Sequence, residues 1–178
     1  MADREDLDFT IDGLRSAGFG GFTTFADLLD GQLQNVPCEP GTYVVIRASD
    51  ASPTFLDTSC GGHFKGRDPA VRREILMGKW NESCALLYIG KADRSTRRRS
   101  LRRRLHEYAR FGRGEPIGHW GGRYIWQLAD SEDLLVAWRA AQHGQTGADA
   151  ESELVAMFKE RYGRLPFANI NDPSRRKR

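Results

Sequence analysis

The chain has 178 residues, the length of a single domain, and its 39% hydrophobic and 10% aromatic content is enough to form a folded core. The formal net charge is only +3, but arginines crowd the middle of the chain, and acidic residues lie mainly near the N-terminus and between residues 130 and 160. Local charge governs attraction to a polyanion, so the small net charge does not exclude a nucleic-acid partner.

Cysteine spacing and hydropathy argue against several classes of protein. The three cysteines, Cys38, Cys60 and Cys84, have spacings that fit neither a zinc site nor a disulfide framework, so we expect reduced thiols. No apolar stretch reaches the ~18 residues that a membrane-spanning helix needs. The first ten residues, "MADREDLDFT", lack the pattern of a signal peptide. We therefore expect a cytoplasmic protein that does not bind membranes.

The first half of the chain predicts an N-terminal helical extension over residues 1–38, followed by a strand and an insertion. Within the extension, "FTTFADLLDG" predicts a short helix with Thr24 as N-cap and Gly31 as its stop. A turn and a β-branched run, "EPGTYVVIRA", predict a strand over residues 39–48. Residues 49–80 are rich in Gly, Ser, Asp and Pro, with one helical piece, "DPAVRREILMGKW".

The second half predicts alternating strands and helices. A second, mostly apolar strand is expected over residues 84–90, a basic helix over 100–111, strands over 122–129 and 133–141, and an amphipathic helix over 148–163. The basic helix carries apolar residues at helical spacing, and seven arginines fall within residues 94–104. Residues 172–178 form a basic tail that should attract phosphates without sequence preference. The order predicts an α+β fold in which helices flank a small, mainly antiparallel β-sheet.

Five stretches carry a resemblance to a known family. Gly41-Thr42-Tyr43 and Tyr88-Ile89-Gly90 resemble the two halves of the signature of the GIY-YIG nuclease superfamily. "LRRRLHEY" is similar to the family's arginine-bearing helix, "ESELVAMFKERYG" to its metal-binding helix, and "PFAN" to its trailing Pro-x-x-Asn. The resemblance covers residues 39–171 in the family's order, which is far more specific than any one stretch.

The sequence also departs from the family pattern. Thr42 replaces the usual isoleucine, and the two tyrosines lie 45 positions apart, so residues 49–80 are an insertion between the first two core strands. The segment before Arg104 is longer than in the excision-repair members of the family. That length leaves Arg102 and Arg103 as rivals for the catalytic position.

The resemblance implies a metal-dependent DNA endonuclease and assigns roles to single residues. Catalytic roles fall on Tyr43, Tyr88, Arg104, Glu151 and Asn169, with Glu151 as the ligand of Mg²⁺ or Mn²⁺, and Tyr108 takes the family's aromatic position. Helix geometry favours Glu151 over Glu153, because Glu151 precedes the buried stripe formed by Leu154 and Val155 by three and four positions.

The chemistry of phosphodiester hydrolysis explains why the first two strands would carry tyrosines, a lysine and a glycine. The reaction needs a nucleophilic water and neutralisation of charge on the phosphate. Tyr43 or Tyr88 would serve as general base if the adjacent Lys91 and a divalent cation favoured the phenolate. Gly90 would allow the backbone to approach the substrate closely.

The remaining candidates are substrate-binding residues. Arg97, Arg98, Arg99, Arg102 and Arg103 would contact backbone phosphates, and Tyr108 and His119 would touch the substrate. Structural alternatives stay open: His119 as a turn residue and Asn169 as a staple of the closing loop. His63 in the insertion belongs either to a target-reading loop or to an ordinary surface loop. DNA is the expected partner, with RNA not excluded. The alternative function is a nucleic-acid-binding protein that keeps the fold without catalysis.

Overall fold

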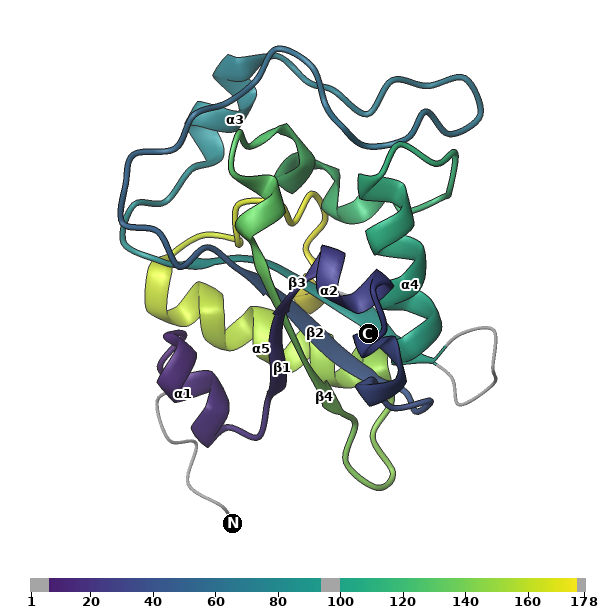
Figure 1. The fold of residues 1–178 in the computed structure, drawn as a ribbon. Helices are drawn as coiled ribbons and strands as arrows, with labels where there is room; N and C mark the ends of the chain where they lie inside the picture. Colours follow the sequence, from purple (N-terminus) through teal and green to yellow (C-terminus); the bar gives the residue numbers. More distant parts are fainter. Residues whose placement is uncertain (1–6, 94–99, 176–178) are drawn as a thin grey trace.

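The computed structural model describes residues 7–93 and 100–175, which form an α+β fold around one antiparallel sheet (Figure 1). The α-helices are α1 (Ile11–Ser16), α2 (Phe25–Leu29), α3 (Arg73–Lys79), α4 (Leu101–Gly112) and α5 (Gly147–Tyr162), and the strands are β1 (Gly20–Thr24), β2 (Gly41–Ile46), β3 (Leu86–Ala92) and β4 (Leu135–Ala140). Short 3-10 helices are η1 (Gln32–Asn35), η2 (Trp120–Gln127), η3 (Ser131–Asp133) and η4 (Pro173–Arg175). The expected fold class is confirmed at this level.

The sheet has the order β1-β4-β2-β3, and each neighbouring pair is antiparallel. All six residues of β2 are buried, as expected for a strand with neighbours on both edges. The strands predicted over residues 39–48, 84–90 and 133–141 are confirmed as β2, β3 and β4. In the register of the first two, Tyr43 lies opposite Gly90 and Val45 opposite Tyr88.

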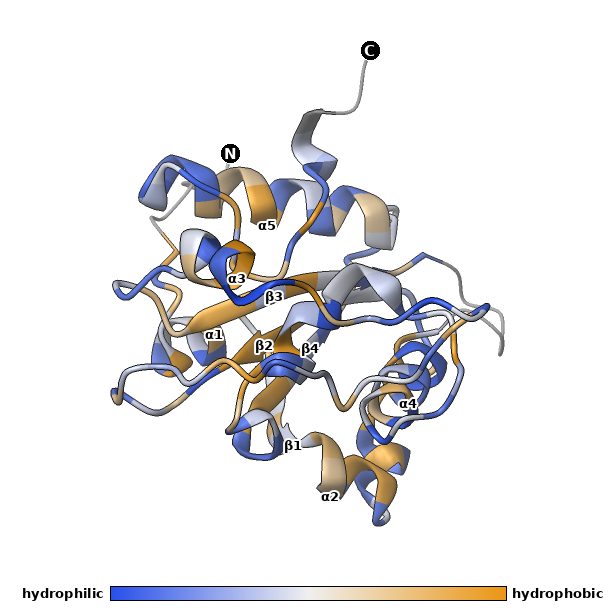
Figure 2. Ribbon diagram, turned by 90° about the horizontal axis from the view of Figure 1, so that it is seen from above, coloured by the Kyte–Doolittle hydropathy of each residue, from blue (hydrophilic) through white to orange (hydrophobic). Residues whose placement is uncertain are grey.

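Each face of the sheet has its own hydrophobic core, because strand residues alternate between faces. Tyr43, Val45 and Tyr88 face a core that includes residues of α2 and α4, whereas Val44 and Ile89 face a core shared with α5. Figure 2 shows α5 on one side of the sheet and α2 and α4 on the other. The two signature tyrosines therefore share the α4 face.

Side-chain caps set the starts of α2, α4 and α5 close to those expected, whereas α3 begins only at Arg73, inside the helical piece expected over residues 68–80. Thr24 caps α2 in a capping box with Asp27. Ser100 caps α4 by accepting from the backbone N–H of Arg103, and α5 begins in a second capping box and ends at Gly163 in the left-handed region. The longest of these helices, α5, has 16 residues, and none of the described helices could cross a membrane.

The strand expected over residues 122–129 is wrong. These residues fall mainly in η2, where four consecutive residues from Tyr124 to Gln127 are buried instead of alternating. The buried amide of Gln127 accepts from the backbone N–H of Val71 and donates to the carbonyls of Leu56 and Val71. The insertion thus holds this segment as a helix.

The predicted N-terminal helical extension also contains a strand. Residues Gly20–Thr24 form β1, which pairs with β4 and adds the fourth strand to the sheet. A bulge lies between Gly21 and Thr23, and both Gly21 and Phe22 have positive φ. The segment "GGFTT" has two glycines and no alternating apolar pattern, so its sequence does not indicate a strand.

Candidate active site

The two tyrosines of the signature lie beside each other on the α4 face. The ring centroids of Tyr43 and Tyr88 are 6.0 Å apart, with the rings edge to face. A Cβ atom at position 90 would lie 2.4 Å from Cζ of Tyr43. Gly90 therefore makes room for the Tyr43 ring, which is a different reason from the close approach of substrate that we expected.

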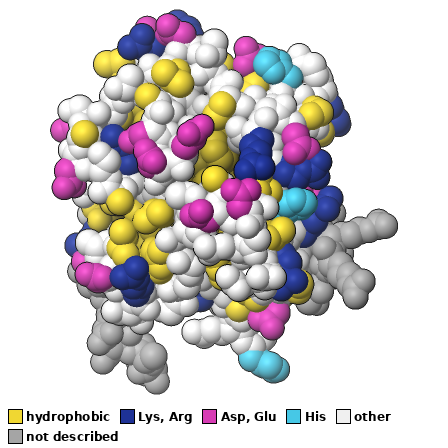
Figure 3. All heavy atoms as spheres, viewed as in Figure 1, with side chains coloured by type: hydrophobic (Ala, Val, Ile, Leu, Met, Phe, Trp, Pro, Cys, Tyr) yellow, Lys and Arg dark blue, Asp and Glu magenta, His cyan; other side chains and the backbone are white. Residues whose placement is uncertain are grey.

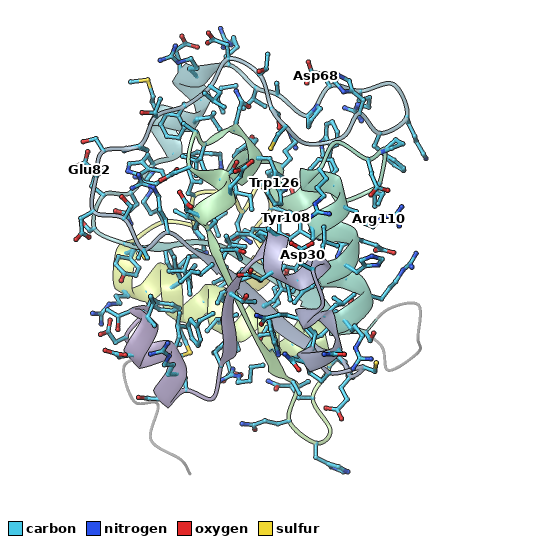
Figure 4. The ribbon with its side chains drawn as sticks, viewed as in Figure 1. Asp30, Asp68, Glu82, Tyr108, Arg110 and Trp126 are labelled. Atoms are coloured by element: carbon cyan, nitrogen blue, oxygen red, sulfur yellow. The ribbon has the colours of Figure 1, made fainter. Side chains whose placement is uncertain are left out.

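Tyr108 and His119 form the inner wall of this group. Their rings are stacked, with centroids 3.8 Å apart and an interplanar angle of 7°. Nε2 of His119 is 3.1 Å from the Tyr43 hydroxyl, and the Tyr108 hydroxyl donates to the carbonyl of Gly122 at 2.7 Å. Figure 4 shows Tyr108 in the interior, whereas Arg110 of the same helix points outward.

The burial of these two rings corrects the substrate contacts expected of them. Tyr108 and His119 have no exposed surface, so neither lies against the solvent-facing side where a substrate would bind. Their contacts instead support the hydroxyl and ring of Tyr43. Both rings pack beside Tyr43 in this arrangement.

His119 is held in its neutral form. Burial, followed by the charge of Arg104, keeps the pKa of His119 well below its usual range. Its second ring nitrogen, Nδ1, is buried and has no hydrogen-bond partner among the described residues. Buried polar atoms without a partner are rare in folded proteins, and this one belongs to the ring that contacts Tyr43.

Arg104 is the arginine of α4 that acts on the tyrosines. Burial raises the pKa of Tyr43, and the charge of Arg104 and a hydrogen bond with it both lower that pKa in return. The Arg104 charge also lowers the pKa of Tyr88, against the larger effect of burial. One guanidinium thus influences both phenols.

The two rivals of Arg104 have other partners. Arg102 donates to the backbone carbonyls of Gln34 and Val36, and so ties α4 to the end of η1. Arg103 donates to Glu107 at 2.7 Å on the exposed flank of α4. Arg104 is therefore the best candidate of the three for a catalytic role.

The ionisation of the tyrosines differs from the general-base expectation. Burial raises the pKa of Tyr43 and raises that of Tyr88 well above its usual value, so both phenols are protonated at neutral pH. A hydrogen bond between them lowers the pKa of Tyr43 and raises that of Tyr88, which makes Tyr43 the more acidic of the pair. Lys91, expected to favour the phenolate, lies on the opposite face of β3, because it follows Gly90 in the strand.

Glu151 approaches the same region from the α5 side. Its Oε2 atom lies 3.2 Å from Nζ of Lys91, and its side chain is only 12% exposed. Burial is the largest cause of the raised pKa of Tyr43 and of Tyr88, and the negative charge of Glu151 is a smaller cause that raises both further. Glu151 therefore lies within electrostatic reach of both tyrosines. The expected burial of Glu151 and exposure of Glu153 are confirmed.

Asn169 holds the outer edge of β3. Its side-chain oxygen accepts from the backbone N–H of Ile89, and its side-chain nitrogen donates to the carbonyl of the same residue, both at 2.9 Å. The next contact is a backbone bond from the N–H of Ala168 to the carbonyl of Leu87. Asn169 therefore acts as a staple for the strand that carries Tyr88, the structural alternative of the sequence analysis.

Only some of the arginines that we expect to bind substrate lie among the described residues. Arg97, Arg98 and Arg99 lie outside the described residues. On the face shown in Figure 3, Lys and Arg side chains gather on the side where α4 lies. The side chain of Arg104 is 31% exposed, while Tyr88 is 6% and Tyr43 0% exposed. Arg104 and the edge of Tyr88 are thus the members of this group that a bound phosphate would meet first.

Sequence reasoning missed the role of Gly122. A Cβ atom there would lie 2.2 Å from the Tyr108 hydroxyl and 2.9 Å from Cε1 of Tyr88. At the neighbouring Gly121, an added Cβ atom would lie 3.1 Å from the Tyr88 hydroxyl. The only sequence signal was the Gly-Gly pair directly after His119 and Trp120.

The donor set near Glu151 is limited. Among residues 7–93 and 100–175, no three His, Cys, Asp or Glu side chains gather into a group that would hold a metal.

Comparison of the chain with models of protein families, with curated proteins and with solved structures finds no match in any of the three.

Proposed function

We propose that the protein is a metal-dependent endonuclease of the GIY-YIG type that hydrolyses phosphodiester bonds in DNA. One observation carries this proposal: the motif residues Tyr43, Tyr88 and Arg104 gather on one face of the sheet, with the charge of Glu151 reaching both tyrosines. These residues come from β2, β3, α4 and α5. Chance motif matches would have no reason to converge on one place.

The exposed members of the group suit the binding of a phosphate. Arg104 would neutralise charge on the phosphate oxygens as it develops in the transition state. The Tyr88 hydroxyl, at the edge of the group, would orient the attacking water. Tyr43 lies behind it and would hold Tyr88 and Arg104 in register, with its own hydroxyl fixed against His119.

A divalent cation fits the donor set on one condition. Mg²⁺ is commonly held by one or two carboxylates together with substrate phosphates and water, so the single carboxylate of Glu151 is sufficient. When bound, such an ion would polarise the phosphate and stabilise the leaving oxygen. Lys91 would have to give up part of its contact with Glu151, and it would then be able to turn toward the incoming phosphate.

A non-catalytic nucleic-acid-binding protein is the alternative, and two observations favour it. Tyr43 is fully buried and Glu151 is already paired with Lys91. A protein that had lost catalysis would keep such contacts for stability and bind DNA through its basic side. The retained carboxylate favours the nuclease, because burial of a carboxylate beside the site adds nothing to the attraction of a polyanion.

The test is plasmid nicking by the wild type and by two matched variants of α5. We expect nicking of supercoiled DNA with Mg²⁺ and none with EDTA. Glu151→Gln should lose nicking but still bind DNA, because the basic side is unchanged. Glu153→Gln, an exposed position on the same helix, should nick like the wild type.

Two outcomes would contradict the proposal or part of it. An active Glu151→Gln with an inactive Glu153→Gln would show that the wrong carboxylate had been chosen. A folded wild type that cuts no supercoiled, branched or single-stranded DNA would refute the nuclease and leave the binding protein.

A further inference from the structure

Beside the tyrosines runs a row of cations and aromatic rings that the motifs do not include. Arg67 and Arg123 lie over the ring of Trp120, at 5.4 and 4.6 Å from its centroid. Arg123 and Lys79 lie over the ring of Tyr124, at 5.0 and 5.8 Å. We call Arg67, Arg123 and Lys79 the cation row. Its members come from the insertion and from η2.

The charges of the cation row are not neutralised by carboxylates. Within the described part of the chain, none of the three has an acidic side chain within salt-bridge distance. Burial and then the charge of Arg164 lower the pKa of Lys79. Burial is also the main cause that lowers the pKa of Arg123, and Arg67 adds to it. Lys79 and Arg123 thus each lie near a like charge, and a bound polyanion would relieve this repulsion.

The backbone contacts of the row account for its position but not for its charge. Arg123 donates to the carbonyls of Pro69 and Trp120, and Lys79 donates to the carbonyl of Asn169 at 3.5 Å. A neutral donor such as glutamine would make similar contacts without the repulsion. Arg67 is exposed, and its cation–π contact is with Trp120.

The row adjoins the candidate active site through η2. Gly121 approaches the Tyr88 hydroxyl, and Gly122 accepts from the Tyr108 hydroxyl, so Arg123 follows directly after two residues of the site wall. Lys79 contacts the backbone of Asn169, whose side chain staples the β3 strand beside Tyr88. The contacts therefore run in order from α4 through the tyrosines and η2 to α3.

We propose that the cation row binds the phosphate backbone of the DNA on the side of the scissile phosphate away from α4. This inference rests on the proposed function, and it gives the insertion over residues 49–80 a role in holding the substrate. Three spaced cations suit the repeated charges of a strand better than one small anion. The aromatic rings hold the cations in place by cation–π attraction.

The test measures the salt dependence of DNA binding in the Glu151→Gln background, with a short labelled duplex as probe. Each lost phosphate contact lowers the slope of log affinity against log salt by about 0.9. Arg67→Gln/Lys79→Gln should therefore lower the slope by about 1.8 and weaken binding on all sequences alike. The matched control is Arg15→Gln/Arg161→Gln, which removes the same charge from α1 and α5.

The result separates the two proposals. An unchanged slope, or an equal loss in the control, would overturn the cation row, provided that thermal unfolding shows both proteins folded. A lowered slope together with a wild type that never nicks DNA would uphold the row and refute the nuclease. Nicking by the wild type with an unchanged slope would do the reverse.

Discussion

Replacement of Asn169 by leucine should destabilise the protein because it uncouples the edge of β3. The side chain is 4% exposed and makes two hydrogen bonds with the backbone of Ile89. Leucine is of similar size but bonds with neither group, and the burial of the site keeps water from replacing the amide. Each buried backbone group left without a partner costs roughly 1–3 kcal/mol, so we expect a total near 3 kcal/mol after the added apolar contact.

For a chain of this length, 1 kcal/mol corresponds to a fall in Tm of about 2–4 °C, so Asn169→Leu should lower the Tm by roughly 6–12 °C. Thermal unfolding followed by circular dichroism measures it, with the exposed Asn171→Ala as control. Nicking should fall along with stability, and cooling should restore part of it. A fall in Tm of less than about 2 °C with nicking abolished would refute the reasoning, since it would make Asn169 a catalytic residue and not a staple.

Gly90→Ala should lower stability by about 1–3 kcal/mol, because its Cβ would lie 2.4 Å from Tyr43, whereas Gly20→Ala in β1 has open space and should be close to neutral; equal Tm values for the two variants would contradict the packing. His119 should make the protein less stable in mild acid. Its folded-state pKa is lowered, so the unfolded chain binds more protons below about pH 6.5, and stability should fall there by at most about 1.4 kcal/mol per pH unit. His119→Phe should show a flatter pH dependence of Tm, and parallel curves would show that His119 does not titrate on unfolding.

The elements predicted from sequence are those whose pattern is local. The β-branched run around Tyr43, the helical spacing of α4 and the amphipathic pattern of α5 each specify their element within a few residues. The segment of η2 was missed because its helix depends on Gln127, whose partners are some 56 and 71 positions away in the insertion. No local signal contains such a contact.

In the candidate site, too, the residues predicted from sequence are those marked by local patterns, and the missed contacts join distant parts of the chain. Tyr43, Tyr88 and Arg104 were found from motifs, and the choice of Glu151 followed from helix geometry. The contact between Tyr43 and His119 joins residues 76 positions apart, and it required the fold to bring the start of η2 against β2. The packing reason for Gly90 was also missed, because the ring that fills its space lies on the neighbouring strand.

The two outer strands of the sheet have a consequence for self-association. An unpaired flat strand is a template on which another copy can add its own strand and begin an aggregate. Here the free side of β3 is occupied by Ala168 and Asn169, and β1 is short and kinked by its bulge with Phe22 at φ 57°. Both edges of the sheet are therefore poor templates for another strand, so residues 20–24 and 168–169 should disfavour aggregation as well as complete the fold.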